Sequence, residues 1–172
     1  PSATSHLYCA DQSQFDGETD LYLVTVCGAG NAPISIPFSG TSVSEGRNAY
    51  VSITSTVSFL SITFQFTSLP INAPLFAVKA DSTLHITGCT FENQTGGSSL
   101  SLSHTLISAT ATSAVEMDTV AFTSLSLAES SLLELNDASL SLTNCIFTAP
   151  AVGTLPLISL SSVIIPSDND DE

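Results

Sequence analysis

The sequence predicts an all-β chain that folds as a single-stranded right-handed parallel β-helix, a solenoid with coils of about 25 residues. Apolar residues recur at one spacing along the chain, and a second apolar patch follows each copy at a matching distance. Ser and Thr fill many of the remaining positions. Such self-similarity is typical of repeat architectures, in which one coil buries its apolar face only by stacking on the next.

The composition favours strands over helices. Of the 172 residues, 43% are hydrophobic and only 10% are charged, and there are 29 Ser and 20 Thr. β-Branched and aromatic residues suit the pleated surface of a sheet, whereas Ser and Thr side chains compete with the hydrogen bonds of a helix. The length suits one domain with a sizeable core.

Three segments share four inward slots, which are the first, third, sixth and eighth residues of an octet. These octets are residues 84–91, 115–122 and 140–147. Alternation along a strand turns the first and third residues inward. The dipeptide after the third residue, Thr-Gly, Asp-Thr or Thr-Asn, has the chemistry of a turn that shifts the phase before the last two slots. Each octet therefore predicts two short strands joined by a tight bend.

Phenylalanine fills the last slot of every octet. A looser fourth copy has, in its four slots, Phe59, Ser61, Phe64 and Phe66. The last slots are then Phe66, Phe91, Phe122 and Phe147, at intervals of 25, 31 and 25 residues. The longer interval contains a loop-like insertion at 94–99. We expect stacking of the coils to place these four rings in one column, the core stack of the protein.

Further apolar patches follow the phenylalanines at residues 75–78, 106–107, 132–135 and 157–160. We expect β-helix coils over residues 34–165, where 34–38 and 50–53 make one more coil. Residues 1–33 do not fit the repeat and are interpreted as an irregular N-terminal cap or a first coil. Residues 166–172 form an acidic tail, interpreted as a solvated end or the start of a linker.

The charge balance excludes several classes of partner. The net charge is −14, and Arg47 and Lys79 are the only basic residues. Nucleic-acid binding needs many Lys and Arg to replace phosphate counterions, and adhesion to an anionic membrane needs them too. No run of 18 apolar residues is present, so we expect no membrane insertion in this segment.

Two elements of the repeat resemble the polymorphic-membrane-protein type of right-handed β-helix, whose shape the pectin-lyase-like superfamily shares. The octet 140–147 and the Cys-Thr-Phe-Glu-Asn of 89–93 resemble its Phe-Asn element, and Gly-Gly-Ser-Ser-Leu at 96–100 is similar to its Gly-Gly-Ala-Ile element. The resemblance covers residues 55–165. It implies the fold of a surface-protein fragment, but fold does not dictate activity.

The four cysteines divide into two pairs. Cys89 and Cys145 occupy the same slot two coils apart, roughly 9.6 Å at the spacing of stacked strands. A disulfide needs Cα atoms within about 7 Å, so we expect free, buried thiols there. Cys9 and Cys27 are candidates for a disulfide, which would fit an oxidising compartment.

Asn93 begins an Asn-Gln-Thr glycosylation sequon on the expected loop and is therefore a glycosylation candidate. The alternative is a turn asparagine whose side chain satisfies backbone groups, as in an asparagine ladder. A glycan requires that Asn93 face outward.

An enzyme is not expected, and neither are a cofactor, a metal site or catalytic residues. Cleavage of polygalacturonate needs basic residues to bind the polyanion and to stabilise developing charge, and a strongly negative domain repels such a substrate. Glu116 and Asp118 are explained as outward and turn residues. His85 and His104 have no second ligand at metal-site spacing in the sequence.

The function expected is that of a non-catalytic structural or adhesive segment of a secreted or cell-surface β-helix protein, so the localisation expected is extracellular or at the cell surface. One alternative is a filament subunit that assembles by end-to-end stacking of coils, because an open coil exposes strand edges. Another is a carbohydrate-binding or carbohydrate-active β-helix. The partners implied are the chain itself, or surface glycans and proteins.

Overall fold

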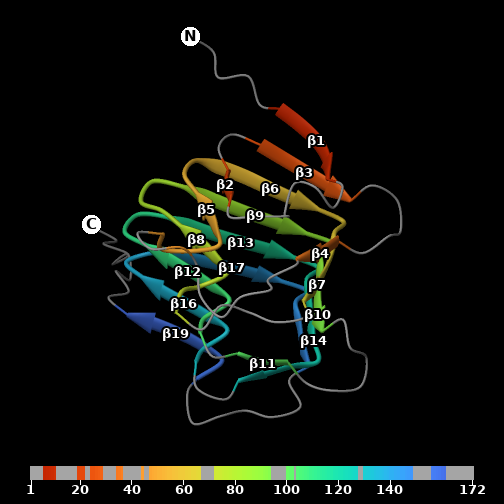
Figure 1. The fold of residues 1–172 in the computed structure, drawn as a ribbon. Coiled ribbons are helices and arrows are strands. Elements are labelled where there is room, and N and C mark those ends of the chain that lie inside the picture. The colour runs from red at the N-terminus through yellow and green to blue at the C-terminus, as the bar shows by residue number, and fades with distance from the viewer. Residues whose placement is uncertain are drawn as a thin grey trace, which may run out of the picture.

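In the computed structural model, the chain is a parallel β-solenoid of about three turns spaced about 27 residues apart, which confirms the predicted fold class. The structure describes residues 6–10, 19–21, 24–28, 34–36, 44, 47–66, 72–93, 100–102, 104–127, 130–148 and 156–161. These residues include no helix, and hence none long and apolar enough to cross a membrane. Figure 1 shows the strands stacked from β1, in red, to β17 and β19, in blue.

Three parallel sheets form the walls of the solenoid, and the chain passes from sheet A to sheet C and then to sheet B. Sheet A contains β1 (His6–Ala10), β3 (Val24–Gly28), β6 (Thr56–Leu60), β9 (Thr83–Thr87), β13 (Ala114–Asp118) and β17 (Ser139–Thr143). Sheet C contains β4 (Ile34–Ile36), β7 (Thr63–Phe66), β10 (Thr90–Asn93), β14 (Ala121–Thr123) and β18 (Ile146–Thr148). Sheet B contains β2 (Thr19–Leu21), β5 (Val51–Ile53), β8 (Phe76–Val78), β12 (Ile107–Thr110), β16 (Leu133–Asn136) and β19 (Ile158–Ser161). A fourth, two-stranded sheet pairs β11 (Leu100–Leu102) with β15 (Leu125–Leu127).

Strands from the first 33 residues continue two of the walls. β1 pairs with β3, which pairs with β6 in sheet A, and β2 pairs with β5 in sheet B. The described part of this segment therefore belongs to the first coils. The acidic tail, residues 166–172, lies outside the described residues.

The bend between sheets A and C repeats in four described coils, at the position where the sequence predicted a turn. Its central residue has a left-handed backbone, with φ of +53° at Ser61, +62° at Gly88, +57° at Thr119 and +52° at Asn144. The amides of the first three of these bends each donate to a carbonyl of the next coil, as Gly88 N does to Asp118 O at 2.9 Å. Only glycine and, less readily, Asn adopt this conformation without strain. The bends therefore stack as a column of their own.

The core stack differs from the prediction at its first member. Phe91 pairs with Phe64 rather than with Phe66, while Phe66 pairs with Asn93. The rings of Phe64 and Phe91 are 5.0 Å apart, those of Phe91 and Phe122 are 4.9 Å apart, and those of Phe122 and Phe147 are 5.0 Å apart, all nearly parallel. Phe66 lies one inward slot further along β7, and its ring also stacks on Phe91, at 6.2 Å and 14°. The predicted stacking is therefore present, but the register predicted for β7 was wrong by one inward slot.

The physical reason for this error lies in β7, where alternation turns two phenylalanines inward. Both Phe64 and Phe66 are fully buried, so either satisfies the pattern of an apolar last slot. The octet 57–64 fills all four slots with apolar residues, whereas the octet 59–66 would place Ser61 inward. Ser61 instead occupies the left-handed bend opposite Gly88.

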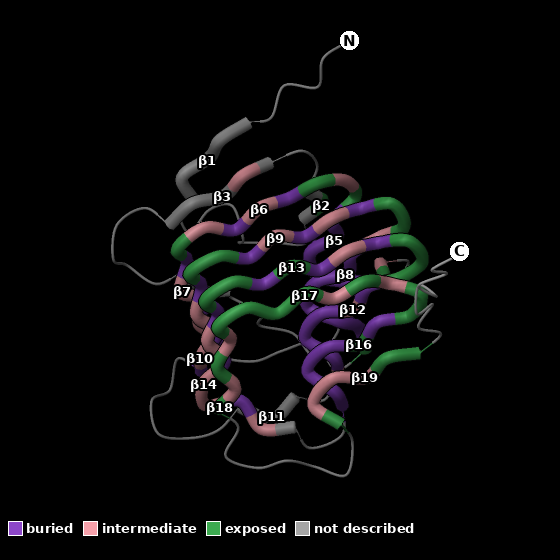
Figure 2. The backbone as a smooth tube through the Cα atoms, turned by 180° about the vertical axis from the view of Figure 1, so that it is seen from behind, coloured by how far each residue is buried: buried purple, intermediate pink, exposed green. Residues whose placement is uncertain are grey.

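The apolar patches predicted after each phenylalanine form the inner face of sheet B. Phe76 pairs with Ile107, which pairs with Leu133, which in turn pairs with Ile158. The buried residues of all three walls form one continuous hydrophobic cluster. Burial decreases at the coil that contains β17, β18 and β19, which Figure 2 shows mainly as intermediate and exposed, in contrast to β12 and β16.

Candidate functional site

Sheet A presents its outward side chains in straight columns, because the coils stack without a shift in register. One column contains Ser58, His85, Glu116 and Ser141. The next contains Leu60, Thr87, Asp118 and Thr143. Hydroxyl, imidazole and carboxylate groups thus gather on one flat wall, which we call the polar face.

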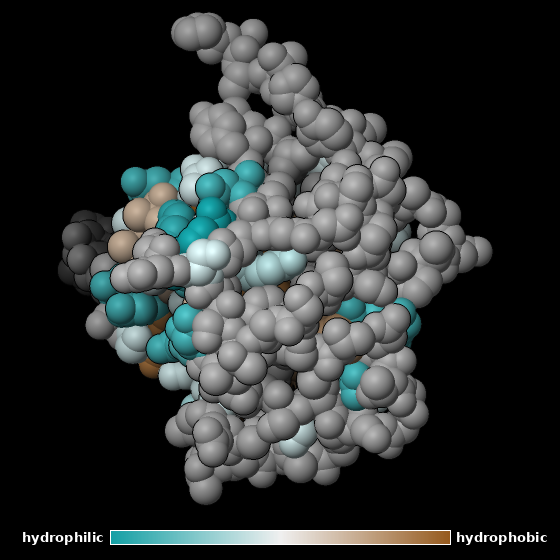
Figure 3. Space-filling model, in the orientation of Figure 1, coloured by the Kyte–Doolittle hydropathy of each residue, from teal (hydrophilic) through white to brown (hydrophobic). Residues whose placement is uncertain are grey.

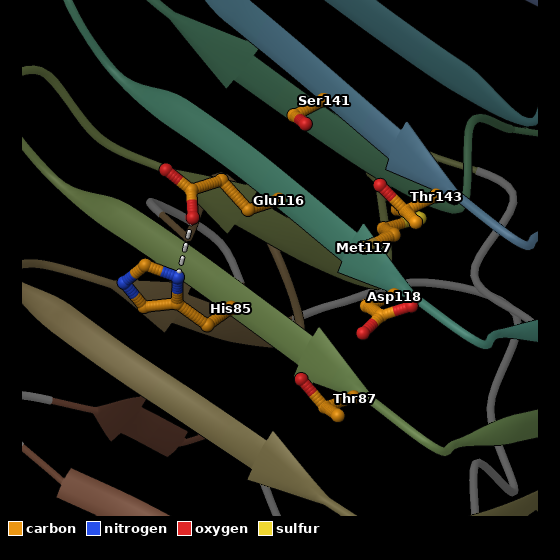
Figure 4. Close-up of a pocket in the computed structure, with 7 residues that line it drawn as sticks. All are labelled: His85, Thr87, Glu116, Met117, Asp118, Ser141 and Thr143. Carbon is orange, nitrogen blue, oxygen red and sulfur yellow. Dashed lines mark ion pairs between the residues drawn. The ribbon is translucent and has the colours of Figure 1, made fainter.

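A shallow hollow of about 180 Å³ lies on the polar face (Figure 4). Its walls come from β9, β13 and β17, and its lining residues are His85, Thr87, Glu116, Met117, Asp118, Ser141 and Thr143. Figure 3, from the side of Figure 1, shows mostly hydrophilic or neutral described surface with small hydrophobic areas.

An ion pair across two coils marks the hollow. His85 Nδ1 lies 2.9 Å from Glu116 Oε2, and both side chains are partly exposed, at 36% and 53%. The pair carries opposite charges when the imidazole is protonated, and an exposed pair of this kind contributes little to stability. The sequence reasoning missed it, because His85 was searched for partners close in sequence. The signal was present, since His85 and Glu116 hold the same outward slot of two octets.

The two acids of the hollow lie on one side of any ligand that would sit there. Glu116 and Asp118 both project from β13, two residues apart and on the same face of the sheet. Thr119 Oγ1 donates to Asp118 Oδ1 at 3.0 Å, which engages that carboxylate in its own bend. Glycoside hydrolysis needs two carboxyl groups that flank the scissile bond. This arrangement suits acceptance of hydrogen bonds from a ligand better than bond cleavage.

The remaining polar contacts hold neighbouring coils together. Arg47 donates to both carboxylate oxygens of Asp20, at 3.1 and 3.3 Å. Gln65 Nε2 donates to Glu92 Oε1 at 2.6 Å between β7 and β10. Within the described ranges, no three His, Cys, Asp or Glu residues are placed to hold a metal ion.

Cys89 and Cys145 occupy the same slot at the inner start of the sheet C strands, and both are free thiols. Cys89 is buried, and Cys145, in the last described coil, is only half-buried. Burial raises the pKa of the Cys89 thiol, against a smaller opposing effect of the Ile62 N–H, which donates to its sulfur at 3.4 Å. A raised pKa keeps Cys89 protonated and unreactive.

Cys9 and Cys27 are register partners on the adjacent strands β1 and β3. Neighbouring parallel strands lie about 4.8 Å apart, within the Cα separation that a disulfide requires. Their side chains lie outside the described residues, so the bridge stays a prediction. Non-reducing mass spectrometry of the unfolded chain should then find two free thiols rather than four.

Asn93 does not lie on an exposed loop. It is the last residue of β10, only 7% exposed, and pairs with Phe66. A glycan cannot be accommodated on a side chain that is buried in this way, so of the two alternatives the burial favours a structural asparagine over glycosylation. Alternation from Phe91 carries Asn93 inward by two residues. The insertion at 94–99 lies outside the described residues.

Comparison of the chain with protein-family models, with curated proteins and with solved structures gives no match. The class of the protein, a parallel β-solenoid, therefore rests on its own sheet pairing and register.

Proposed function

We propose that the chain is a non-catalytic structural or adhesive segment of a secreted or cell-surface β-helix protein. The resemblance of its octets to the polymorphic-membrane-protein type of β-helix supports this proposal. So does the chemistry of the polar face, where Ser, Thr and acidic groups can accept and donate hydrogen bonds without a pair of flanking carboxylates.

The observation that carries the proposal is the continuity of the core through successive coils. Stacked rings run from Phe64 to Phe147, and all three walls share one hydrophobic cluster. Neighbouring described coils are therefore packed against each other along all three walls. Interiors packed in this way have low compressibility, which suits a rigid spacer that holds a binding face at a fixed distance.

An adhesion assay with matched variants tests the proposal. Beads coated with the chain should bind surfaces that bear extracellular glycans or proteins, and the variant E116Q/D118N should lose that binding. The control E134Q/D137N removes the same amount of charge from another part of the solenoid and should bind normally. Absence of binding to every surface would leave only the structural role, which is tested by force spectroscopy on the chain between two handles.

A spacer should resist extension until it unfolds cooperatively, whereas gradual extension at low force would overturn the structural role. Release of reducing ends or of unsaturated uronates from a polysaccharide by the purified chain would overturn the non-catalytic assignment altogether. The outcome of the catalytic assay does not affect that of the mechanical assay, so the non-catalytic assignment and the structural role are tested separately.

The hollow favours one second candidate, the binding of neutral carbohydrate. Carboxylates accept hydrogen bonds from sugar hydroxyl groups, and His85, Thr87 and Ser141 add further polar groups around the same depression. The net charge of −14 disfavours polyanionic glycans. A glycan array should then give hits among neutral sugars that disappear with E116Q/D118N, and hits confined to sulfated or uronic-acid glycans would contradict this candidate.

A further inference from the structure

Apolar surface gathers at one end of the solenoid. We call residues 138–161, which contain β17, β18 and β19, the terminal coil; residues 149–155 within it are not described. The large hydrophobic side chains that are exposed in the described part of the chain all belong to it, with Leu142 at 37%, Ile146 at 60% and Leu160 at 54%. Leu142 and Leu160 occupy the slots of the buried Met117 and Leu135 one coil earlier. They are exposed because no described coil covers them.

The terminal coil is also free of charge, in a protein that carries −14. Residues 138–167 contain no Asp, Glu, Lys, Arg or His. By contrast, the preceding coil contains Glu116, Asp118 and Glu134. Depletion of charge around a core of exposed apolar side chains distinguishes the centre of a protein interface from ordinary surface.

The edges of the terminal coil carry none of the usual protection against pairing. Within the described residues, β17, β18 and β19 each have a neighbouring strand on one side only. Natural proteins blunt such edges with charged side chains, Pro or bulges. The three strands contain neither charge nor Pro, so their free backbone groups can pair with another strand.

We propose that a second copy of this chain docks on the terminal coil, end to end, in a two-fold symmetric dimer. A two-fold interface uses the same patch on both subunits, so the charge-free end meets an identical charge-free end. Head-to-tail stacking would instead bring it against the first coils, where Asp20 of β2 and Arg47 form a partly exposed ion pair. Two bodies of charge −14 repel each other, whereas residues 138–161 themselves bring no charged side chain into the contact.

Light scattering during gel filtration of the 172-residue chain tests the dimer. The monomer mass is 17.8 kDa, and we expect about twice this value, with dissociation on dilution. The variants L160E and L160K should each raise the dissociation constant by about tenfold or more, because like charges then face each other. An equimolar mixture of L160E and L160K should restore the dimer, because opposite charges then meet.

The matched controls are T87E and T87K, which place the same charges on the polar face two coils away, and both should dimerise normally. Circular dichroism and the thermal midpoint show whether each variant is folded. For the unsubstituted chain alone, amide exchange in β17 and β19 should slow as the concentration rises.

Three results would overturn the proposal. The first is a monomer at all concentrations, which would mean that other residues cover the terminal coil. The second is growth into species larger than a dimer, as expected of head-to-tail filaments. The third is failure of the L160E and L160K mixture to associate. The inference does not rest on the adhesive function, and none of these results bears on binding by the polar face.

Discussion

Truncation of Phe122, one of the two inner rings of the core stack, should be strongly destabilising. Phe122 is 2% exposed, and its ring lies 4.9 Å from Phe91 at 9° and 5.0 Å from Phe147 at 4°. Phe→Ala in a core costs about 3–5 kcal/mol. Two aromatic pairs, each worth about 0.5–1.5 kcal/mol beyond burial, are lost together. We therefore expect F122A to lower the free energy of unfolding by about 4–5 kcal/mol.

The same reasoning gives a smaller value at the end of the column. Phe147 is half-buried and stacks on Phe122 alone, so F147A loses one aromatic pair and part of the burial. We expect a loss of about 2 kcal/mol for F147A. F122L keeps most of the buried volume and loses both pairs, which should cost about 1–3 kcal/mol.

Urea denaturation followed by far-ultraviolet circular dichroism measures these differences by linear extrapolation. The slope with urea should stay unchanged among the variants, so that shifts of the midpoint report stability. Equal losses for F122A and F147A, or a loss below about 1 kcal/mol for F122A, would refute the view that stacked rings carry the core.

Four other substitutions test the bends and the buried polar groups. T119N should raise the thermal midpoint by relieving a β-branched residue at φ +57°, a strain of about 1 kcal/mol, whereas G88A at φ +62° should lower it by a similar amount. S113A should stabilise the fold or leave it unchanged in urea denaturation, because the buried Ser113 hydroxyl has no hydrogen-bond partner in the protein. Because the pKa of the Cys89 thiol is raised in the folded chain, this thiol makes a pH-dependent contribution to the unfolding free energy. The contribution is fully present below the pKa of the thiol in the unfolded chain, about 8.5, and is lost as the pH rises through its pKa in the folded chain. C89V should therefore flatten the fall in unfolding free energy above about pH 8, and an unchanged fall would contradict the buried thiol as its source.

The inward pattern made most of the solenoid predictable from the sequence. Leu84, Val115 and Leu140 are the first slots of their octets, and they form successive register partners in sheet A. The bends were predictable for the same reason, because Gly88 and Asn144 are residue types that tolerate a left-handed backbone. These features depend on local chemistry and on a period of known length.

Register and contacts between coils were harder to predict. Phe64 and Phe66 are both inward and both rings stack on Phe91, so periodicity alone did not decide which of them is its register partner. Asn93 was placed on a loop because a sequon and a Gly-Gly pair follow it, yet alternation within β10 continues through it. To predict the contact of His85 with Glu116, one must know the length of the coil between them. A surface insertion changes that length without affecting the core.

In each wall, the inward residues are determined by the packing of the core, whereas the outward residues are available for binding. Inward slots are fixed by packing, as Leu84 and Ile86 show in β9, where both are fully buried. The residue between them, His85, points outward, and its contact with Glu116 is exposed and worth little to stability. Nothing in the packing of the core thus requires an imidazole beside a carboxylate at this place. Substitutions of Glu116 should consequently leave the unfolding free energy within about 0.5 kcal/mol of the original. Any change in binding that they cause then reports the chemistry of the polar face rather than a change in folding.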